Sequence, residues 1–388
     1  MTPERFPTKW EPVRRRKRDH DKSLIALAAG GTGGHLFPAE ALAQELRRRG
    51  KRVLLVTDAR GARYAAKFPA DERFEISAAS PSIGGPVAKG FAAISLVGGL
   101  FTALLEFRKR RPAAAVGFGG YPSLPAMKAA ALLGIPYGVH EQNSVLGRAN
   151  RMLASGAGFI AHGFPMLEKA PKEARLVEVG NPVRDAVAAL ASAAYTPPAS
   201  EGLIRVLVFG GSQGASLFSR VLPAAFEKLP AEMRARLHIV QQARVDEIET
   251  VKARYSAAGI KADIAPFFAD LPLQIARADL IIARAGASTV TELSAIGRPS
   301  ILVPLKIAMD DHQTGNARVL AEAGAAIVMP ERAFSEAELT GALGALFSAP
   351  SRLAAMAAAA RGRVKNGAAK TLADLVEEIA AGARKDAA

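Results

Sequence analysis

The sequence predicts an α/β fold made of two doubly wound, parallel-sheet domains that face a central cleft. The first observation is that short apolar runs alternate with segments of helical length along the chain. Parallel strands need such crossovers, and they are apolar throughout because both faces of their sheet are covered. The second observation is that a strand, a glycine loop and a helix, first seen near residue 24, recur 180 residues later.

Nine apolar runs are the candidate strands. In the first half they are residues 24–29, 52–57, 113–118, 136–141 and 158–163, and in the second half 204–211, 236–242, 278–286 and 300–305. The repeated units read "LAAGGTGGHLFPAEAL" and "LVFGGSQGASLFSRVL", and a third glycine loop reads "VGFGGYPSLPAM". We place the domain break in or near "GNPVRDAV", which gives an N-terminal domain of residues 23–184 and a second domain from residue 185.

Composition excludes several classes of protein. The 388 residues are 49% hydrophobic, enough for two cores, because a single core stops growing near about 250–300 residues. The lack of cysteine excludes disulfides and thiolate metal sites. The first residues lack the apolar stretch of a signal peptide.

The net charge of +15 predicts an anionic partner, either a phosphorylated substrate or an anionic lipid surface. Part of this charge lies in Arg14 to Arg18, within residues 1–22, which we expect to form a disordered basic tail. The chain has no RNA-recognition signature, zinc-finger spacing or mixed basic and aromatic pattern. Nucleic acid is therefore not expected as a partner.

The first glycine loop fits neither common nucleotide fingerprint. A dinucleotide loop requires Gly-x-Gly-x-x-Gly, but Gly31 and Gly33 are followed by Leu36 where the last glycine should stand, although Asp58 mimics the acid that binds ribose. The Gly-Lys-Ser/Thr of a nucleoside-triphosphatase is absent as well. A more general function remains, in which glycine N–H groups and a helix N-terminus hold a diphosphate.

His35 lies at the first turn of the helix that follows this loop. The helix dipole disfavours a charged imidazole there, so a neutral ring that acts as a base is one interpretation. A histidine that only packs or caps at a tight turn is the other, and the residues alone do not decide between them.

Residues 90–105 carry no charge and are followed by Arg108, Lys109, Arg110 and Arg111. This uncharged stretch is shorter than the roughly 20 residues that cross a bilayer. Apolar surface beside a basic cluster is typical of a protein that docks on anionic lipid. A buried helix with a charged end is the alternative. The docking interpretation takes Leu100, Phe101 and Leu104 as the apolar contacts, with Arg108 and Lys109 as the basic ones.

Seven motifs, in this order and spacing, resemble the MurG family within glycosyltransferase family 28. They are "GGTGGHLFPAEALA", "GFGGYPSLPA", "HEQNSVLGRAN", "VGNPVR", "GGSQGA", "RAGASTVTEL" and "DDHQTGNA". The resemblance runs from about residue 23 to the C-terminus. It implies the GT-B fold, with donor nucleotide in the C-terminal domain (residues 185–363), lipid acceptor in the N-terminal domain, and a last helix (residues 364–388) that crosses back onto that domain.

The resemblance also implies a donor site for UDP-N-acetylglucosamine. Arg184 and the backbone at Phe268 would contact the uracil, and Glu292 would hold the ribose hydroxyls. Asn143 and Gln313 would bind the sugar hydroxyls. Taken singly, such residues could be ordinary turn or surface residues, and only their joint order favours a site. The full donor set is Thr32, Gly33, Gly34, Asn143, Arg184, Ser212, Phe268, Ala287, Ser288, Thr289, Val290, Thr291, Glu292 and Gln313.

The family inverts the configuration of the sugar, so the protein must deprotonate the acceptor hydroxyl and stabilise the leaving diphosphate. His35 is the first candidate base and Glu141 the second. Gly119, Gly120 and Tyr121 would position the acceptor. No metal or other cofactor is expected, because the one Asp-x-Asp motif lies at Asp19–Asp21 in the basic tail.

The acceptor implied is an undecaprenyl-diphosphate-linked muramyl-pentapeptide at the cytoplasmic face of the bacterial inner membrane. Contact with an anionic membrane surface, and with other cell-wall enzymes, would follow from that location. Three rivals remain: a UDP-sugar:diacylglycerol transferase, a UDP-GlcNAc 2-epimerase of the same fold, and a binding module without catalysis. The basic and apolar segment argues against the epimerase, which has no need of a membrane.

Overall fold

A computed structural model describes residues 21–31, 33–64, 68–78, 85–211, 215–305, 309–363, 365 and 367–382. Thr32, Ser212 and residues 1–20 of the basic tail lie outside the described residues. The first strand, β1, begins at Asp21, two residues before the predicted start of the first domain.

In the N-terminal part of the described chain, seven parallel strands form a sheet in the order β3-β2-β1-β4-β5-β6-β7. These strands are β1 (Asp21–Ala28), β2 (Arg52–Thr57), β3 (Glu72–Glu75), β4 (Pro112–Gly117), β5 (Tyr137–Glu141), β6 (Ile160–His162) and β7 (Leu176–Glu178). The helices that connect them are α1 (Gly33–Arg48), α2 (Ala59–Tyr64), α3 (Pro86–Arg110), α4 (Ser123–Leu132) and α5 (Arg148–Leu153).

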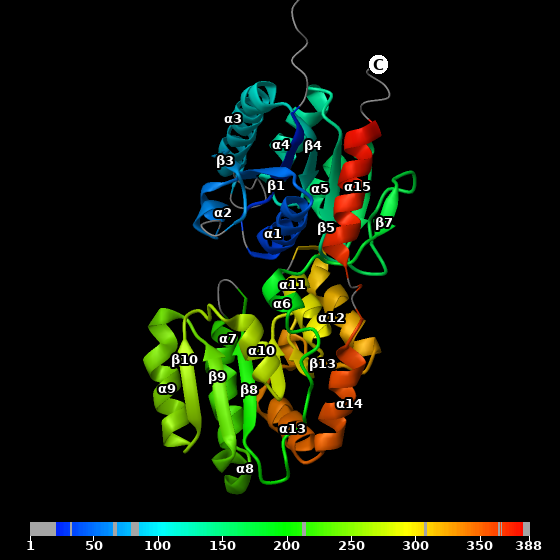
Figure 1. The fold of residues 1–388 in the computed structure, drawn as a ribbon. Coiled ribbons are helices and arrows are strands. Elements are labelled where there is room, and N and C mark those ends of the chain that lie inside the picture. Colours follow the sequence, from blue (N-terminus) through cyan, green and yellow to red (C-terminus); the bar gives the residue numbers. More distant parts are fainter. Residues whose placement is uncertain are drawn as a thin grey trace, which may run out of the picture.

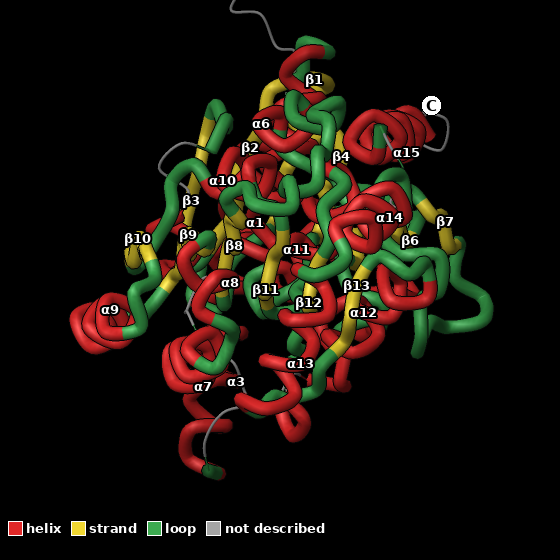
Figure 2. Tube along the Cα trace, turned by 90° about the horizontal axis from the view of Figure 1, so that it is seen from below, coloured by secondary structure: helices red, strands yellow, loops and turns green. Residues whose placement is uncertain are grey.

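The second sheet has six parallel strands among the described residues, in the order β10-β9-β8-β11-β12-β13. They are β8 (Ile204–Phe209), β9 (Leu237–Gln242), β10 (Lys261–Ala265), β11 (Leu280–Ala283), β12 (Ser300–Leu302) and β13 (Ala326–Val328). Figure 2 shows them side by side in this order, with helices on both faces. The helices are α6 (Asp185–Ala188), α7 (Ser216–Glu227), α8 (Ala231–Ala235), α9 (Ile248–Ala257), α10 (Leu271–Arg277), α11 (Ala287–Ile296), α12 (His312–Glu322), α13 (Glu336–Phe347) and α14 (Pro350–Ala360).

The predicted fold class is confirmed: two doubly wound parallel sheets form two domains, one above the other (Figure 1). All nine predicted strands are present. The prediction missed β3, β7, β10 and β13, which are edge strands or lie next to an edge. β3, for example, alternates half-buried and exposed residues, so it lacks the continuous apolar run of a central strand.

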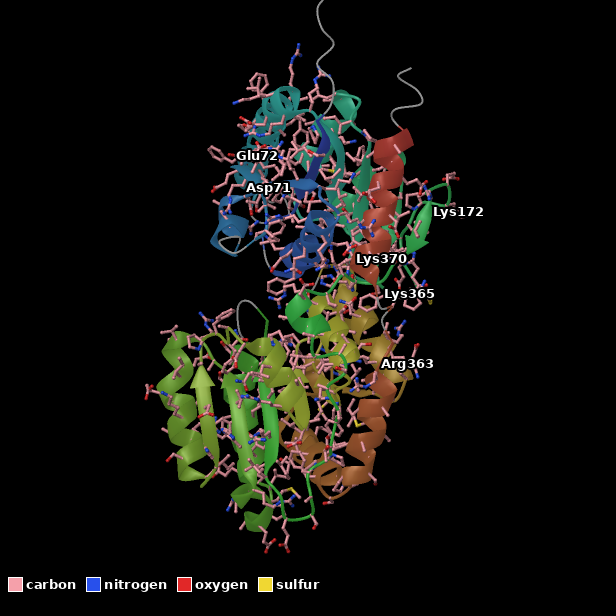
Figure 3. The ribbon with its side chains drawn as sticks, in the orientation of Figure 1. Asp71, Glu72, Lys172, Arg363, Lys365 and Lys370 are labelled. Atoms are coloured by element: carbon pink, nitrogen blue, oxygen red, sulfur yellow. The ribbon has the colours of Figure 1, made fainter. Side chains whose placement is uncertain are left out.

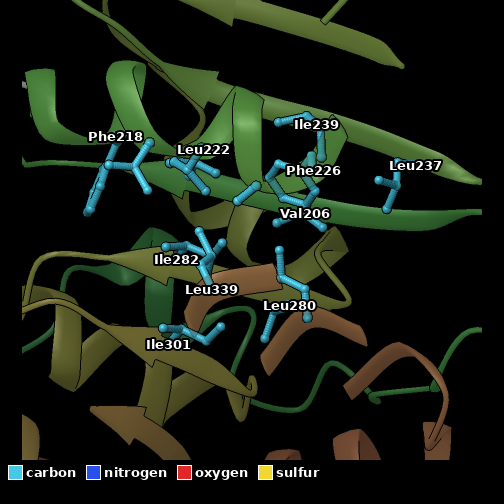
Figure 4. Packing of buried hydrophobic residues seen from close by; sticks show 14 of the residues in the cluster. Val206, Phe218, Leu222, Phe226, Leu237, Ile239, Leu280, Ile282, Ile301 and Leu339 are labelled. Atoms are coloured by element: carbon cyan, nitrogen blue, oxygen red, sulfur yellow. The ribbon is translucent and has the colours of Figure 1, made fainter. Parts of the chain in front are cut away.

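Each sheet is covered by apolar residues on both faces, as its continuous apolar strands require. In the C-terminal domain, Phe218, Leu222 and Phe226 of α7 pack against Val206 of β8 and Ile239 of β9 (Figure 4). A separate cluster on the opposite face includes residues of α10, α11 and α12. In the N-terminal domain, α1 lies over one face, and α3, α4 and α5 over the other.

The last helix, α15 (Ala368–Gly382), belongs by packing to the first domain. Leu372 and Val376 are fully buried in the same cluster as residues of α1 and β4. Arg49 at the end of α1 donates hydrogen bonds to Asp374 at 2.7 Å and to Glu377 at 2.8 Å. The chain therefore crosses between the domains twice, and Figure 1 shows α15 alongside the upper domain.

Two arginine side chains hydrogen-bond to backbone carbonyls at these crossings. Arg361, just before the second crossing, donates to the carbonyls of Ala191 and Ala193, which lie in the first crossing. The buried guanidinium of Arg298 donates to Ala276 O, Gly297 O and Ala194 O. The two connections between the domains are thus bonded to each other and to the end of α11.

Helix α3 corrects one sequence expectation. It is 25 residues long, and within the described chain its Gly90–Arg110 part is a helix long and apolar enough to cross a membrane by length and composition alone. The shorter run of residues 90–105 had suggested otherwise. In the structure, however, α3 packs along the domain through Ala103 and Phe107, which are fully buried. Only 22% of the apolar window is buried within the domain, so most of it is at least partly exposed.

The exposed face of α3 also differs from the one expected. Phe101 is exposed, but Leu100 and Leu104 pack at the edge of the core. The side chains that project outward are Phe91, Ile94, Val97, Phe101 and Leu105. Arg110 is held by ion pairs with Glu106 and, at 2.7 Å, with Glu72 of β3 (Figure 3), whereas Arg108 and Lys109 are exposed.

Replacing Leu372 by alanine should destabilise the first domain, because this buried side chain fastens α15 to the sheet. We expect the free energy of unfolding, measured by urea titration, to fall by about 2–5 kcal/mol, as large-to-small changes in cores do. Lys370→Ala is the matched control, since that side chain is exposed on the same helix (Figure 3). Equal stability of the two variants would show that α15 is only loosely attached.

Candidate active site

The polar residues picked out from the sequence gather where the two domains meet. In both sheets the carboxyl ends of the strands point to this junction, as ligand sites in doubly wound folds require (Figure 1). The N-terminal domain contributes the loop before α1, the loop after β4 and the end of β5. The C-terminal domain contributes the first turns of α11 and α12.

The ring of His35 lies against the loop after β4. A Cβ atom built on Gly119 would stand 3.4 Å from His35 Cδ2, and one built on Gly120 would stand 3.6 Å from Nδ1. Both glycines have positive φ values, 80° and 72°, which side-chain-bearing residues rarely adopt. Gly119 and Gly120, predicted to face the acceptor, therefore form the surface on which the ring of the candidate base rests.

His35 is in an environment that favours its neutral form. Burial lowers the pKa of the imidazole below its ordinary value of 6.5, while the charge of Glu141 and the Gly30 carbonyl act in the opposite direction. The Nδ1 atom of the ring is buried. A ring that is neutral at physiological pH can accept a proton, which is what a general base must do.

Glu141 occupies a different position from the one expected of a second base. Its Oε1 accepts hydrogen bonds from the backbone and the side-chain amide of Asn143, both at 3.1 Å. Its Oε2 accepts from Gly147 N at 2.9 Å and from Asn150 Nδ2 at 2.8 Å. This buried carboxylate therefore has its oxygen lone pairs engaged by four hydrogen bonds.

Asn316 connects this loop to the second domain. The residue is fully buried on α12; its Oδ1 accepts from Ser144 N at 3.0 Å and its Nδ2 donates to Asn143 Oδ1 at 3.1 Å. The Nδ2 group also donates to Ala285 O, next to α11. One amide on α12 thus connects the turn of Asn143 to the start of α11, and all three segments carry predicted donor-binding residues. Gln313, one turn earlier on α12, has its Oε1 bonded to Leu305 N at 2.9 Å.

The first turn of α11 offers polar groups to the junction. The helix begins after Gly286 without a side-chain cap, so its first N–H groups have no intrahelical partner. Ser288 Oγ is buried there and also makes no hydrogen bond within the described residues. Ala287 and Val290 are buried in the core, so they could contact a ligand only through the backbone. Thr289 is half-buried, and Thr291 Oγ1 accepts from Asn181 at 3.0 Å.

Glu292 lies on the next turn of α11 and is paired with Arg184. Arg184 Nη2 is 3.3 Å from Glu292 Oε1, and the guanidinium lies 3.8 Å from the centre of the Phe37 ring on α1. Burial raises the pKa of the Glu292 carboxyl, and Arg184 opposes that shift. These three side chains line a small pocket between the domains, together with Asn181, Pro182 and Ser288.

The remaining predicted residues are more scattered. Gly33 and Gly34 stand at the start of α1, one buried and one exposed, and Tyr121 follows the two glycines under His35. Phe268 is half-buried in the loop after β10, three strands away from β11 in the sheet. The part of the chain that the structure describes contains no group of three or more His, Cys, Asp or Glu residues placed to hold a metal ion.

Sequence reasoning missed four residues that hold the site together. Asn150, Asn181 and Asn316 are buried amides that bond to neighbouring loops, and Phe37 supports Arg184. The three asparagines lie inside the quoted motifs "HEQNSVLGRAN", "VGNPVR" and "DDHQTGNA". A side-chain amide carries both donors and an acceptor, which was the available signal that these residues connect loops: Asn150 and Asn181 donate, and Asn316 donates and accepts.

Comparison with known proteins agrees with this arrangement. Residues 25–161 match the model of the glycosyltransferase family 28 N-terminal domain, and residues 205–379 match that of the C-terminal domain. A protein of Methylobacterium nodulans named as UDP-N-acetylglucosamine--N-acetylmuramyl-(pentapeptide) pyrophosphoryl-undecaprenol N-acetylglucosamine transferase is 51% identical over 361 residues, 92% of this chain and 97% of its own. The chain belongs to the MurG family of glycosyltransferases.

A second sequence relative and two solved structures extend this comparison. The Caulobacter vibrioides protein of the same name is 50% identical over 359 residues, covering 92% of this chain and 99% of its own. The crystal structure of Acinetobacter baumannii MurG superposes with a TM-score of 0.73 at 30% identity, over 92% of this chain and 99% of that one. A protein of Listeria monocytogenes described as a UDP-N-acetylglucosamine 2-epimerase shares only the fold, at 14% identity and a TM-score of 0.61. The chain is therefore a glycosyltransferase with the GT-B fold.

Replacing Gly119 by leucine should lower transferase turnover at least tenfold. A Cβ atom at this position already stands in van der Waals contact with the His35 ring, at 3.4 Å, so the atoms beyond it must displace the ring, and a shift of about 1 Å can cost 100-fold. Gly134→Leu is the control: its φ of 66° imposes similar backbone strain, but nothing lies within 4 Å of the added Cβ atom. The positive φ alone should cost both variants about 1–2 kcal/mol of stability in urea titrations. Equal turnover in the two variants would contradict the role given to Gly119 and Gly120 as the surface that supports the His35 ring.

Proposed function

We propose that the protein transfers N-acetylglucosamine from UDP-N-acetylglucosamine to the 4-hydroxyl of the muramyl residue of a polyprenyl-diphosphate-linked muramyl-pentapeptide. The relatives at 50–51% identity are named for this reaction. The observation that carries the proposal is the position of His35. A neutral imidazole rests on two glycines of the first domain and faces the junction with the second.

In this proposal the C-terminal domain binds the donor. The uncapped N-terminus of α11, with Ser288 Oγ, receives the diphosphate, because N–H groups at a helix N-terminus attract anions. Glu292 accepts hydrogen bonds from the ribose hydroxyls, and Arg184 moves from its carboxylate towards the base as the nucleotide enters. Gln313 uses its side-chain Nε2, and Asn143 its partly exposed amide, to bind the sugar.

The N-terminal domain activates the acceptor. The proton of the acceptor hydroxyl passes to Nε2 of His35, because the other ring nitrogen, Nδ1, is buried. As the muramyl O4 attacks the anomeric carbon, its proton passes to the imidazole and the bond from that carbon to the diphosphate oxygen breaks. One displacement inverts the configuration and releases UDP. No metal is required, since N–H groups offset the charge that develops on the leaving group.

Glu141 serves this reaction as a positioning residue. Its four hydrogen bonds hold residues 141–150 beside His35, and its charge stabilises the imidazolium that forms when the proton arrives. Tyr121 directly follows Gly119 and Gly120, where it would help to position the acceptor. The rival reactions, hexose transfer to diacylglycerol and 2-epimerisation, receive no support from the named relatives at 50–51% identity.

We also propose that the exposed face of α3 holds the protein on the cytoplasmic face of the bacterial inner membrane as a peripheral protein. Phe91 is 68% exposed and Phe101 64%, and Ile94, Val97 and Leu105 lie on the same face. Burying each large apolar side chain in lipid contributes about 1.5–3 kcal/mol. Arg108 and Lys109 extend the face with positive charge, which favours an anionic membrane surface. Binding to other cell-wall enzymes would occur at the same location.

The proposed reaction is tested with purified protein, labelled UDP-N-acetylglucosamine and a lipid-linked muramyl-pentapeptide. We expect transfer to this acceptor, and little with UDP-N-acetylgalactosamine as donor or diacylglycerol as acceptor. His35→Gln should lower kcat by about 100-fold or more, the usual contribution of a general base, while the Kd for UDP stays within about twofold. Product formation with diacylglycerol alone would overturn the assignment.

The pH profile gives the same test a second readout. The pKa of His35 lies below 6.5 in the folded protein, so kcat/KM should stay level as the pH falls to 6.5. It should then decline as the pH falls through the lowered pKa, because the protonated imidazole cannot accept the hydroxyl proton. If kcat/KM instead falls already above pH 6.5, and still does so in the His35→Gln variant, another group is titrating and another group is the base.

Replacing Phe91, Val97 and Phe101 together by serine should reduce binding to vesicles of anionic phospholipid by tenfold or more in co-sedimentation. UDP binding should be unchanged, because the nucleotide site lies in the other domain. Leu203→Ser, an exposed apolar position in the C-terminal domain, serves as the control. If the triple variant and the parent sediment equally with vesicles, α3 is not the membrane contact.

A further inference from the structure

The two domains contain similar glycine loops, and the family's reaction places nucleotide in only one of them. Strands β1 and β8 occupy the same place in their sheets, and each is followed by two glycines. The second glycine of each pair is left-handed, with φ of 82° at Gly31 and 85° at Gly211. The backbone turns are therefore alike, and the difference must lie in what surrounds them.

In the first domain a carboxylate lies beneath the loop. Asp58 follows β2 and is buried; its Oδ1 accepts hydrogen bonds from Gly31 N and Gly61 N, both at 2.9 Å. Arg60 Nε approaches the other oxygen at 3.2 Å. In dinucleotide-binding folds an acid at this position binds the ribose. Here it is directed into the loop, where it occupies the Gly31 N–H and adds a negative charge.

The second domain has neutral groups at the same place. Val56 pairs with Ala28, so Asp58 stands level with Gly30; Gln241 pairs with Val208, so Ala243 stands level with Gly210. The carboxylate position is thus taken by a buried alanine. Gln242, one residue earlier, supports the loop instead: its Oε1 accepts from Gly210 N at 3.0 Å, and its Nε2 donates to Pro266 O at 3.1 Å.

We infer that this difference in charge determines which domain accepts the nucleotide diphosphate. The inference rests on the proposed function, in which UDP-N-acetylglucosamine is the donor. A fixed carboxylate under a loop repels phosphate oxygens, and Arg60, whose side chain is 59% exposed to solvent, offsets only part of this charge. Gln242 supplies the same support without the charge. Asp58 therefore prevents the first loop from binding the nucleotide diphosphate, and it stabilises the turn that carries His35. Gln242 and Ala243 add no charge beside Gly210, so the second loop can bind the diphosphate.

The decisive variant is Gln242→Glu, which has nearly the same shape and adds one negative charge. At pH 8 we expect calorimetry to show at least tenfold weaker binding of UDP, but less than twofold weaker binding of uridine, which has no phosphates. Lowering the pH from 8 towards 5 favours the protonated form of the introduced carboxyl group at this buried position, because burial raises its pKa, so the UDP affinity should move back towards that of the parent at the same pH. A defect caused by misfolding would weaken UDP and uridine alike.

Two further variants make the test specific. Gln242→Met removes the hydrogen bonds without adding charge and should weaken UDP by less than Gln242→Glu does. Ala243→Asp places a carboxylate level with Gly210, as Asp58 is level with Gly30, and should repeat the selective loss of UDP. The inference is overturned if both acidic variants bind UDP as the parent does, or lose UDP and uridine equally. A parent that fails to bind UDP would instead overturn the proposed function.

Discussion

A buried carboxylate, Glu141, is the group on which the arrangement of the site depends. A charge removed from water is tolerated only when it is fully hydrogen-bonded, and Glu141 satisfies this with four N–H donors drawn from residues 143–150. These bonds fix the turn that presents Asn143, and Asn143 in turn meets Asn316 of the other domain. The same charge acts on the neighbouring His35. The loop beside the proposed base, the amide proposed to bind the sugar and the contact between the domains are thus linked through one side chain.

The loops of the two domains differ in chemistry, and the functions proposed for the domains differ accordingly. The first domain holds an imidazole on glycines and has a carboxylate under its loop, which suits proton removal from a hydroxyl group. The second presents an uncapped helix N-terminus and an unpartnered serine hydroxyl, which suit an anion. Two sheets of similar topology thus provide opposite electrostatic environments, which transfer between a diphosphate and an alcohol requires.

Much of the fold follows from the sequence because central strands and glycine loops have strong local signals. The run "RVLLVT" is apolar because both its faces are covered, and β3 was missed because its exposed residues interrupt such a run. The orientation of α3 could not be predicted, since apolar residues occur all round it. Only the position of the sheet decides that Phe107 is buried and Ile94 exposed.

The site was predicted unevenly for a related reason. The order of the motifs correctly predicted that His35, Glu292 and Asn143 lie at one junction. It could not predict the surroundings of Glu141, because the four donors to that carboxylate are positioned only when the loop of residues 143–150 folds. The importance of Asn316 likewise depends on contact between residues 173 positions apart in the chain. Spacing within motifs identifies the residues that meet, whereas the direction of each hydrogen bond depends on the packed domains.

The bonds from Arg361 to residues 191 and 193 have a mechanical consequence. Two peptide connections that are bonded to each other must bend together, so any movement of one domain relative to the other involves both of them. Opening wide enough for a bulky lipid-borne sugar would therefore strain the two connections at the same time.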